Sequence, residues 1–142
     1  MMKNSKKPIK QVLLIDSNIW IDATLGKNEM VKRELEYLES ISRKVVINQV
    51  VQIELHHNIL AKSFPTLENK LLNIQVLNLS KEVGAYALSL VKGYPNKLKC
   101  ADALIAATAR IYGLELYTNN VKDFGEISGL KLYKPAFHKL PF

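Results

Sequence analysis

Short continuous apolar runs alternate along the chain with longer segments whose apolar residues recur at helical spacing. Such runs are typical of strands buried on both faces, and we expect strands at residues 12–15, 45–47, 74–79, 114–118 and 130–133. The helical spacing predicts helices at residues 29–43, 49–61, 64–72, 80–92 and 100–112. This alternation predicts an α/β fold, a three-layer sandwich whose central parallel sheet of four to five strands is flanked by helices.

Three residues fit the ends of these predicted helices. Asn48 follows a strand and is a suitable N-cap for the next helix, and Ser80 stands in the same relation to the helix that begins after it. Gly113 follows an Ala-rich helical stretch, where glycine adopts the left-handed conformation that ends many helices. These residues support the predicted boundaries.

The chain divides into a short leader, one domain and a short tail. Residues 1–10 carry four lysines and Pro8 and are expected to form a flexible basic leader, residues 11–135 one domain, and residues 136–142 a C-terminal tail. The apolar runs are too short to cross a bilayer, and the basic start lacks the apolar core of a signal peptide. We therefore expect a cytoplasmic protein without a membrane segment.

Charge and cysteine content limit the partners and the kinds of site that this chain can have. The net charge of +7 and the pI near 9.5 favour a polyanionic partner, either nucleic acid or an acidic protein, although a surplus of charge for solubility explains them equally well. Cys100 is the single cysteine, which excludes an intrachain disulfide and a thiolate metal cluster. The three histidines show no arrangement that would activate it as a nucleophile.

Three acidic residues occupy positions that the fold alone does not require. Asp16 directly follows the first strand, at the edge where parallel sheets bind ligands, although capping of the following turn would also explain it. Glu54 lies on the inward stripe of its helix, and no lysine or arginine stands at helical spacing to neutralise it. Asp102 begins a helix and shares a face with small apolar residues, yet an acid at a helix N-terminus is also ordinary.

A fourth polar segment follows a later strand. Residues 118–124 turn into one expected helical turn that brings Asn120 and Asp123 to the same sheet edge. Carboxylates that converge without a matching base stay ionised only if a cation lies between them. Oxygen ligands without cysteine or clustered histidine select hard ions, so these acids, if they converge, predict a Mg²⁺ or Mn²⁺ site.

Four segments together resemble the motifs of PIN-domain nucleases, above all the VapC-type toxins of toxin–antitoxin pairs. These segments are VLLIDSNI at 12–19, VQIEL at 51–55, ADALIAATA at 101–109 and TNNVKDF at 118–124. The likeness extends from Val12 to about Tyr133, and the last two segments are its most specific parts. It implies a PIN-like fold and Mg²⁺- or Mn²⁺-dependent endoribonuclease activity. It also implies a homodimer that a cognate antitoxin neutralises.

The resemblance also assigns roles to individual residues. Asp16, Glu54 and Asp102 match the family's metal-binding acids, and Asp123 is favoured over the neutral Asn120 for the fourth position. Asp16 and Asp102 would be the main inner ligands. Ser17 and Thr118 match polar positions that orient the acids. We also expect three lysines near the acids to contact the phosphates of an RNA substrate, namely Lys97, Lys99 and Lys122.

Two other classes of function compete with this interpretation. A strand-end aspartate can be a phosphoryl-accepting nucleophile, but haloacid-dehalogenase-like hydrolases need a second aspartate where this chain has Asn18, and the acidic pair and lysine of a receiver domain are not found. A catalytically inactive RNA-binding or scaffold protein on the same fold is the main alternative. We expect such a protein to have lost one or more of the acids.

Overall fold

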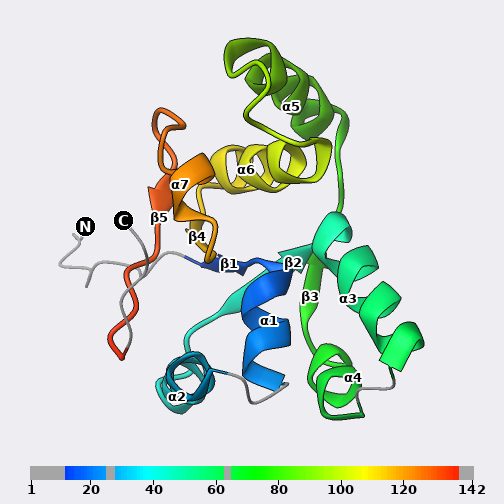
Figure 1. The fold of residues 1–142 in the computed structure, drawn as a ribbon, viewed down its shortest axis with the longest axis vertical. Helices are drawn as coiled ribbons and strands as arrows, with labels where there is room; N and C mark the ends of the chain where they lie inside the picture. Colours follow the sequence, from blue (N-terminus) through cyan, green and yellow to red (C-terminus); the bar gives the residue numbers. More distant parts are fainter. Residues whose placement is uncertain (1–11, 25–27, 63–64, 138–142) are drawn as a thin grey trace, which may run out of the picture.

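The computed structural model describes residues 12–24, 28–62 and 65–137, so the predicted leader and most of the predicted tail lie outside the described residues. Its centre is a sheet of five parallel strands in the order β3-β2-β1-β4-β5 (Figure 1). The strands are β1 Leu13–Ile15, β2 Val45–Asn48, β3 Gln75–Leu77, β4 Glu115–Tyr117 and β5 Lys131–Leu132. All five predicted strands and their parallel arrangement are confirmed.

Helices cover both faces of this sheet and complete the predicted sandwich. They are α1 Ser17–Thr24, α2 Glu29–Ser40, α3 Gln49–Lys62, α4 Pro65–Leu71, α5 Lys81–Gly93, α6 Cys100–Tyr112 and α7 Val121–Phe124. Figure 1 shows α1, α2 and α4 on one side of the sheet and α5, α6 and α7 on the other. None of the helices that the structure describes is long and apolar enough to cross a membrane.

The helix α1 corrects one expectation, because the sequence analysis predicted only a turn after Asp16. Ile19, Trp20 and Ala23 of α1 are buried, and their spacing of one and four residues forms a short apolar stripe against the sheet. Polar residues at the start of this segment favoured a turn, whereas burial of the stripe stabilises a helix of two turns. The chain therefore leaves the sheet edge as a helix.

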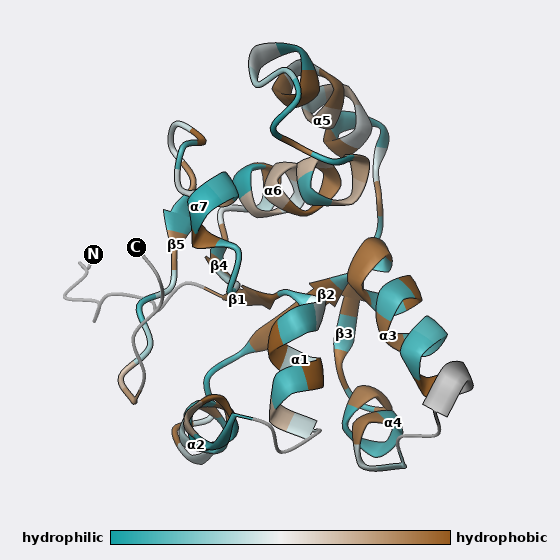
Figure 2. Ribbon diagram, in the orientation of Figure 1, coloured by the Kyte–Doolittle hydropathy of each residue, from teal (hydrophilic) through white to brown (hydrophobic). Residues whose placement is uncertain are grey.

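The strand β1 forms the middle of the core and fixes the position of Asp16. Its three residues are fully buried, because β2 and β4 pair with its two edges and helices cover both faces. In Figure 2 the hydrophobic colour follows the central strands, while hydrophilic residues lie on the outer surfaces of the helices. Since the strands are parallel, the residues after β1, β2 and β4 emerge at one edge of the sheet.

The predicted helix ends are confirmed in detail. Asn48 Oδ1 accepts a hydrogen bond of 2.9 Å from the backbone N of Val51, and Ser80 Oγ accepts one of 3.1 Å from the backbone N of Val83. Gly113 has a φ of 66°, the left-handed conformation expected after α6. The Asn48 cap matters for the site, because it starts α3 at the sheet edge and places Glu54 in the second turn of this helix.

Candidate active site

Asp16 lies at the carboxyl end of β1 and is almost entirely buried. Its Oδ1 accepts a hydrogen bond of 2.8 Å from the backbone N of Ser17, and its Oδ2 accepts one of 2.8 Å from Thr118 Oγ1. Burial raises the pKa of Asp16, and the hydrogen bonds from Thr118 and Ser17 oppose that shift. Asp16 therefore contacts the first residue of α1, where the sequence analysis considered a turn, and also Thr118, which follows β4.

Glu54 reaches the same edge from α3. Ser17 Oγ donates a hydrogen bond of 2.9 Å to Glu54 Oε1, so Ser17 contacts Asp16 through its backbone and Glu54 through its hydroxyl. Burial raises the pKa of Glu54, the Ser17 hydrogen bond lowers it, and the charge of Asp16 raises it again. Glu54 and Asp16 are thus neighbours, as the sequence analysis expected.

Asp102 brings a third carboxylate from the first turn of α6. Burial raises the pKa of Asp102 to about 6, and the negative charges of Asp16, Asp123 and Glu54 add to this effect, while Lys99 opposes it. The other three predicted acids therefore lie within electrostatic range of Asp102. The four acids come from four different places in the fold. Asp16 follows β1, and the other three lie in α3, α6 and α7.

The loop after β4 supplies both residues considered for the fourth position. Asp123 lies half-buried in α7 and acts on Asp102 through its charge, whereas Asn120 Nδ2 donates a long hydrogen bond of 3.4 Å to Asp102 Oδ2. Thr118 Oγ1 accepts a hydrogen bond of 3.0 Å from the backbone N of Asn120 while it donates to Asp16. The structure places both Asn120 and Asp123 beside Asp102.

Sequence reasoning missed three polar residues next to this site. Asn119 Nδ2 donates a hydrogen bond of 2.8 Å to Asp22 Oδ2 in α1, and the backbone N of Asn119 donates one of 3.4 Å to Asn18 Oδ1. Asn18 and Asp22 are four residues apart and lie on one face of α1. This spacing could have been recognised only if α1 had been predicted as a helix.

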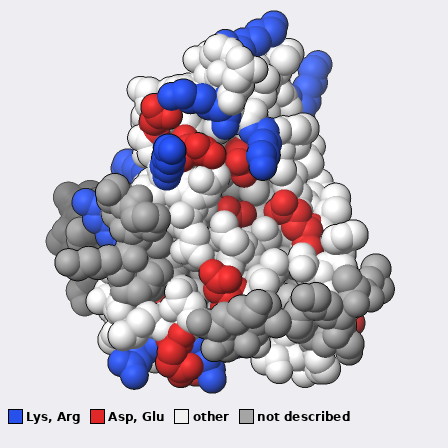
Figure 3. Space-filling view, in the orientation of Figure 1, with Lys and Arg blue, Asp and Glu red and all other residues white. Residues whose placement is uncertain are grey.

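The three predicted phosphate contacts lie in different situations. Lys97 forms a salt bridge with Glu126, with distances from its Nζ of 2.9 and 3.0 Å to the two carboxylate oxygens. Lys99 stands close enough to Asp102 to affect its pKa, and Lys122 is exposed on α7. Figure 3 shows acidic side chains in the middle of one face and basic ones around those in its upper part, where Figure 1 places α5, α6 and α7.

The donor chemistry of the site fits a hard divalent ion. Within the described ranges, no lysine or arginine forms an ion pair with any of the four acids, whose carboxylates are held by hydroxyl, amide and backbone donors. Among the same residues, no three acidic, histidine or cysteine side chains are arranged to hold one ion. Mg²⁺ commonly takes only one or two carboxylates and keeps several waters, so a site for it does not need three such side chains around one ion.

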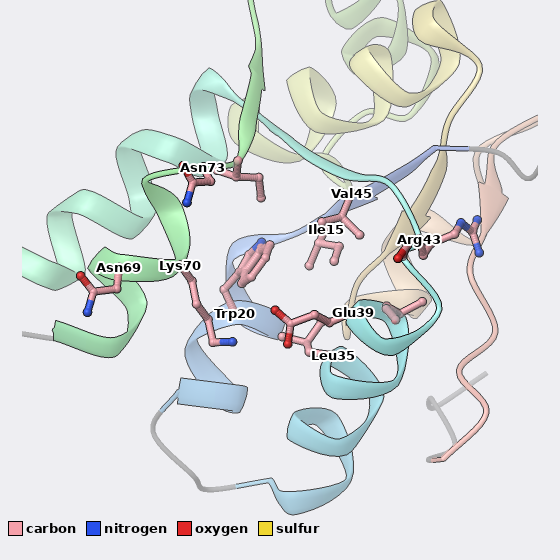
Figure 4. A pocket seen from close by; sticks show the side chains of 12 residues that line it. Ile15, Trp20, Leu35, Glu39, Arg43, Val45, Asn69, Lys70 and Asn73 are labelled. Atoms are coloured by element: carbon pink, nitrogen blue, oxygen red, sulfur yellow. The ribbon is translucent and has the colours of Figure 1, made fainter.

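A cavity elsewhere in the molecule does not include these acids. It has a volume of about 540 Å³ and lies between α1, α2, α4 and the start of β2 (Figure 4). Trp20, Leu35, Leu38 and Val45 form much of its apolar wall, and Glu39, Arg43 and Lys70 are among its polar residues. None of the four acids lines this cavity, so it is not part of the site at the sheet edge.

Comparisons with known proteins agree with this architecture. A family model described as PIN domain matches residues 13–130. A search of the curated proteins finds no match. Among solved structures, a chain of a toxin–antitoxin complex from Klebsiella pneumoniae is 29% identical with a TM-score of 0.68, and the match covers 83% of this chain and 94% of that one.

Two further structures share the fold at lower identity. A chain of DNA-bound VapBC from Salmonella typhimurium is 18% identical with a TM-score of 0.72, covering 87% of this chain and 98% of that one. A chain of VapBC2 from Rickettsia felis, in a complex with a DNA fragment from the VapBC2 promoter, is 22% identical with a TM-score of 0.70. The match covers 86% of this chain and 97% of that one.

Proposed function

Since the chain belongs to the PIN domain family, we propose that it is a Mg²⁺- or Mn²⁺-dependent endoribonuclease and the toxin of a toxin–antitoxin pair. The observation that carries the proposal is that Asp16, Glu54, Asp102 and Asp123 meet at one sheet edge, where no lysine or arginine of the described residues forms an ion pair with them. The negative charges of the other three acids act on Asp102, and a divalent cation would relieve this repulsion.

The residues of the site divide into ligands and residues that orient them. Asp16 and Asp102 would bind the metal directly, and Glu54 and Asp123 would hold water ligands or a second ion. Ser17 and Thr118 hold Glu54 and Asp16 through their hydroxyls, which limits the rotation of both carboxylates. Asn120 contacts Asp102 and serves the same purpose for that carboxylate.

Hydrolysis of a phosphodiester then needs no histidine base. When bound, Mg²⁺ or Mn²⁺ supplies Lewis-acid chemistry, which makes a water more acidic and neutralises charge on the phosphate. The four carboxylates repel RNA, so affinity for the substrate must come from basic residues around them. We propose Lys99 and Lys122 as phosphate contacts, whereas Lys97 could make one only by leaving Glu126. We expect products with a 5′-phosphate and a 3′-hydroxyl.

The partners follow from the same proposal. The relatives in the complexes from Klebsiella, Rickettsia and Salmonella are described as parts of toxin–antitoxin or VapBC assemblies. By analogy we propose that this protein forms a homodimer and is bound by a cognate antitoxin. We propose that it acts in the cytoplasm and that its substrate is RNA. An inactive RNA-binding protein on this fold is the alternative, and retention of all four acids favours the enzyme over it.

The test is RNA cleavage by the purified protein during titration with Mn²⁺, in parallel with Asp16→Asn. This substitution preserves shape and removes one charge, so we expect cleavage to fall more than about 100-fold while RNA binding persists. Glu68→Gln, an exposed change on α4, is the matched control and should cleave like the parent. RNA binding by the parent without metal-dependent cleavage would establish the alternative, and full activity of Asp16→Asn would remove Asp16 from the mechanism.

A further inference from the structure

The loop after β4 is held at three consecutive residues, each by a different element. Thr118 donates to Asp16 at the end of β1, and Asn120 donates to Asp102 in α6. Between them, Asn119 donates to Asp22 in α1. The two outer contacts reach carboxylates of the site, whereas the middle one reaches an acid outside it.

The Asn119 contacts are the connection between this loop and α1. The hydrogen bond from Asn119 Nδ2 to Asp22 Oδ2 is 2.8 Å long, shorter than the 3.4 Å bonds from Asn119 N to Asn18 and from Asn120 to Asp102. Asp22 is half-buried, and a charged acceptor strengthens a hydrogen bond from an amide donor. Asp22 is therefore the strongest anchor of this loop on the side of α1.

We propose that Asp22 is a positioning residue for the metal site, which rests on the function proposed above. By holding Asn119, it fixes the backbone of residues 118–120, so that the Thr118 hydroxyl and the Asn120 amide stay directed at Asp16 and Asp102. In this account Asp22 is not a ligand, and its role is to hold Asn119 through its Oδ2. Outer residues that orient metal ligands typically change metal affinity 10- to 100-fold when they are removed.

The experiment combines amide hydrogen exchange without metal and Mn²⁺ binding, measured on Asp22→Ala, Asn119→Ala and the double variant. We expect faster exchange at Asn119 and Asn120 in both single variants and about 10-fold weaker Mn²⁺ binding. The double variant should bind Mn²⁺ as tightly as the single variant with the lower affinity, because both changes remove the same hydrogen bond. Asp22→Asn retains a carbonyl acceptor and should recover most of the affinity.

Thr24→Ala is the control on the same helix. The Thr24 hydroxyl donates to the backbone of Trp20 within α1, so its loss should lower stability without altering exchange in the loop or Mn²⁺ affinity. Parent-like exchange and Mn²⁺ affinity in folded Asp22→Ala, or additive losses in the double variant, would overturn the role of Asp22. If Asp22→Ala does not fold, Asn119→Ala and Asp22→Asn give the same comparison.

The two proposals fail in different ways. A parent protein that binds no Mn²⁺ overturns the proposed function and the effect of Asp22 on metal, while the exchange measurement still decides whether Asp22 anchors the loop. A parent that binds Mn²⁺ and cleaves RNA, together with an unaffected Asp22→Ala, overturns the positioning role alone.

Discussion

Small hydroxyl side chains hold the buried carboxylates of this site. Ser17 and Thr118 each have a short side chain, and each contacts a carboxylate that is distant in the chain or in a different element. These neutral donors reduce the cost of burying a carboxylate without neutralising it, so the charge remains available for a cation. Asp102 accepts a longer hydrogen bond, 3.4 Å from the Asn120 amide, and its pKa is raised to about 6.

This raised pKa predicts how stability depends on pH in the metal-free protein. The unfolded chain releases the Asp102 proton near its ordinary pKa of 3.8, whereas the folded protein keeps it until about pH 6. The folded state therefore binds more protons between these values, and the free energy of unfolding falls as pH rises through them. Asp102→Asn removes this dependence.

Thermal melts in a chelator between pH 4 and pH 7 measure the effect. We expect the Tm of Asp102→Asn minus the Tm of the parent to increase by a few degrees as pH rises. Most of this increase should be complete once the pH exceeds about 6. Glu68→Gln, which changes an exposed acid, serves as the reference for general charge effects. Melting curves of parent and Asp102→Asn that shift in parallel with pH would show that Asp102 ionises as it does in an unfolded chain.

At the scale of elements, the periodicity of the sequence was sufficient for most of the fold. The strands and the helices α2 to α6 were predictable because their apolar residues face the sheet over several turns or are buried on both faces. The helix α1 was not predictable, because its apolar stripe is short and its first residues are typical of a turn.

The contacts between elements were less predictable than the elements themselves. The convergence of the four acids followed from the parallel sheet, since strand ends meet at one edge. The hydrogen bond between Asn119 and Asp22 and the salt bridge between Lys97 and Glu126 depend on where loops lie on neighbouring helices. Local pattern contains no information on such long-range register, so these partners could not be predicted from the sequence.

The cap residue Asn48 connects two of the helices that carry acids. Its Oδ1 caps α3, and its Nδ2 donates a hydrogen bond of 3.0 Å to Thr108 Oγ1 in α6, all within the buried interior. Asn48→Ala should lower the free energy of unfolding by about 2 kcal/mol, because it removes a cap and a second buried hydrogen bond. Urea denaturation measures this change.

The matched control for this prediction is Ser80→Ala, which removes the cap of α5 alone. The Ser80 cap is partly exposed, and we expect a loss of about 1 kcal/mol. If the loss for Asn48→Ala were no larger than that for Ser80→Ala, the contact with Thr108 would contribute nothing to the junction of α3 and α6.

At the scale of the whole molecule, a basic protein surrounds an acidic centre. A net charge of +7 attracts polyanions such as RNA over a distance, whereas carboxylates repel phosphates unless a cation neutralises them. This distribution explains why charge alone left several partners open in the sequence analysis. Only the location of the acids relative to the fold separates a metal-dependent nuclease from a protein that simply binds a polyanion.

Direct titration of the metal-free protein with Mn²⁺ at pH 7.5, followed by the electron paramagnetic resonance signal of free Mn²⁺, tests the central claim. We predict saturable binding of one or two ions to the parent and to Glu68→Gln, and at least about 10-fold weaker binding to Asp16→Asn and Asp102→Asn. Binding that is absent from the parent, or equally strong in all four proteins, would contradict a metal site built from these carboxylates.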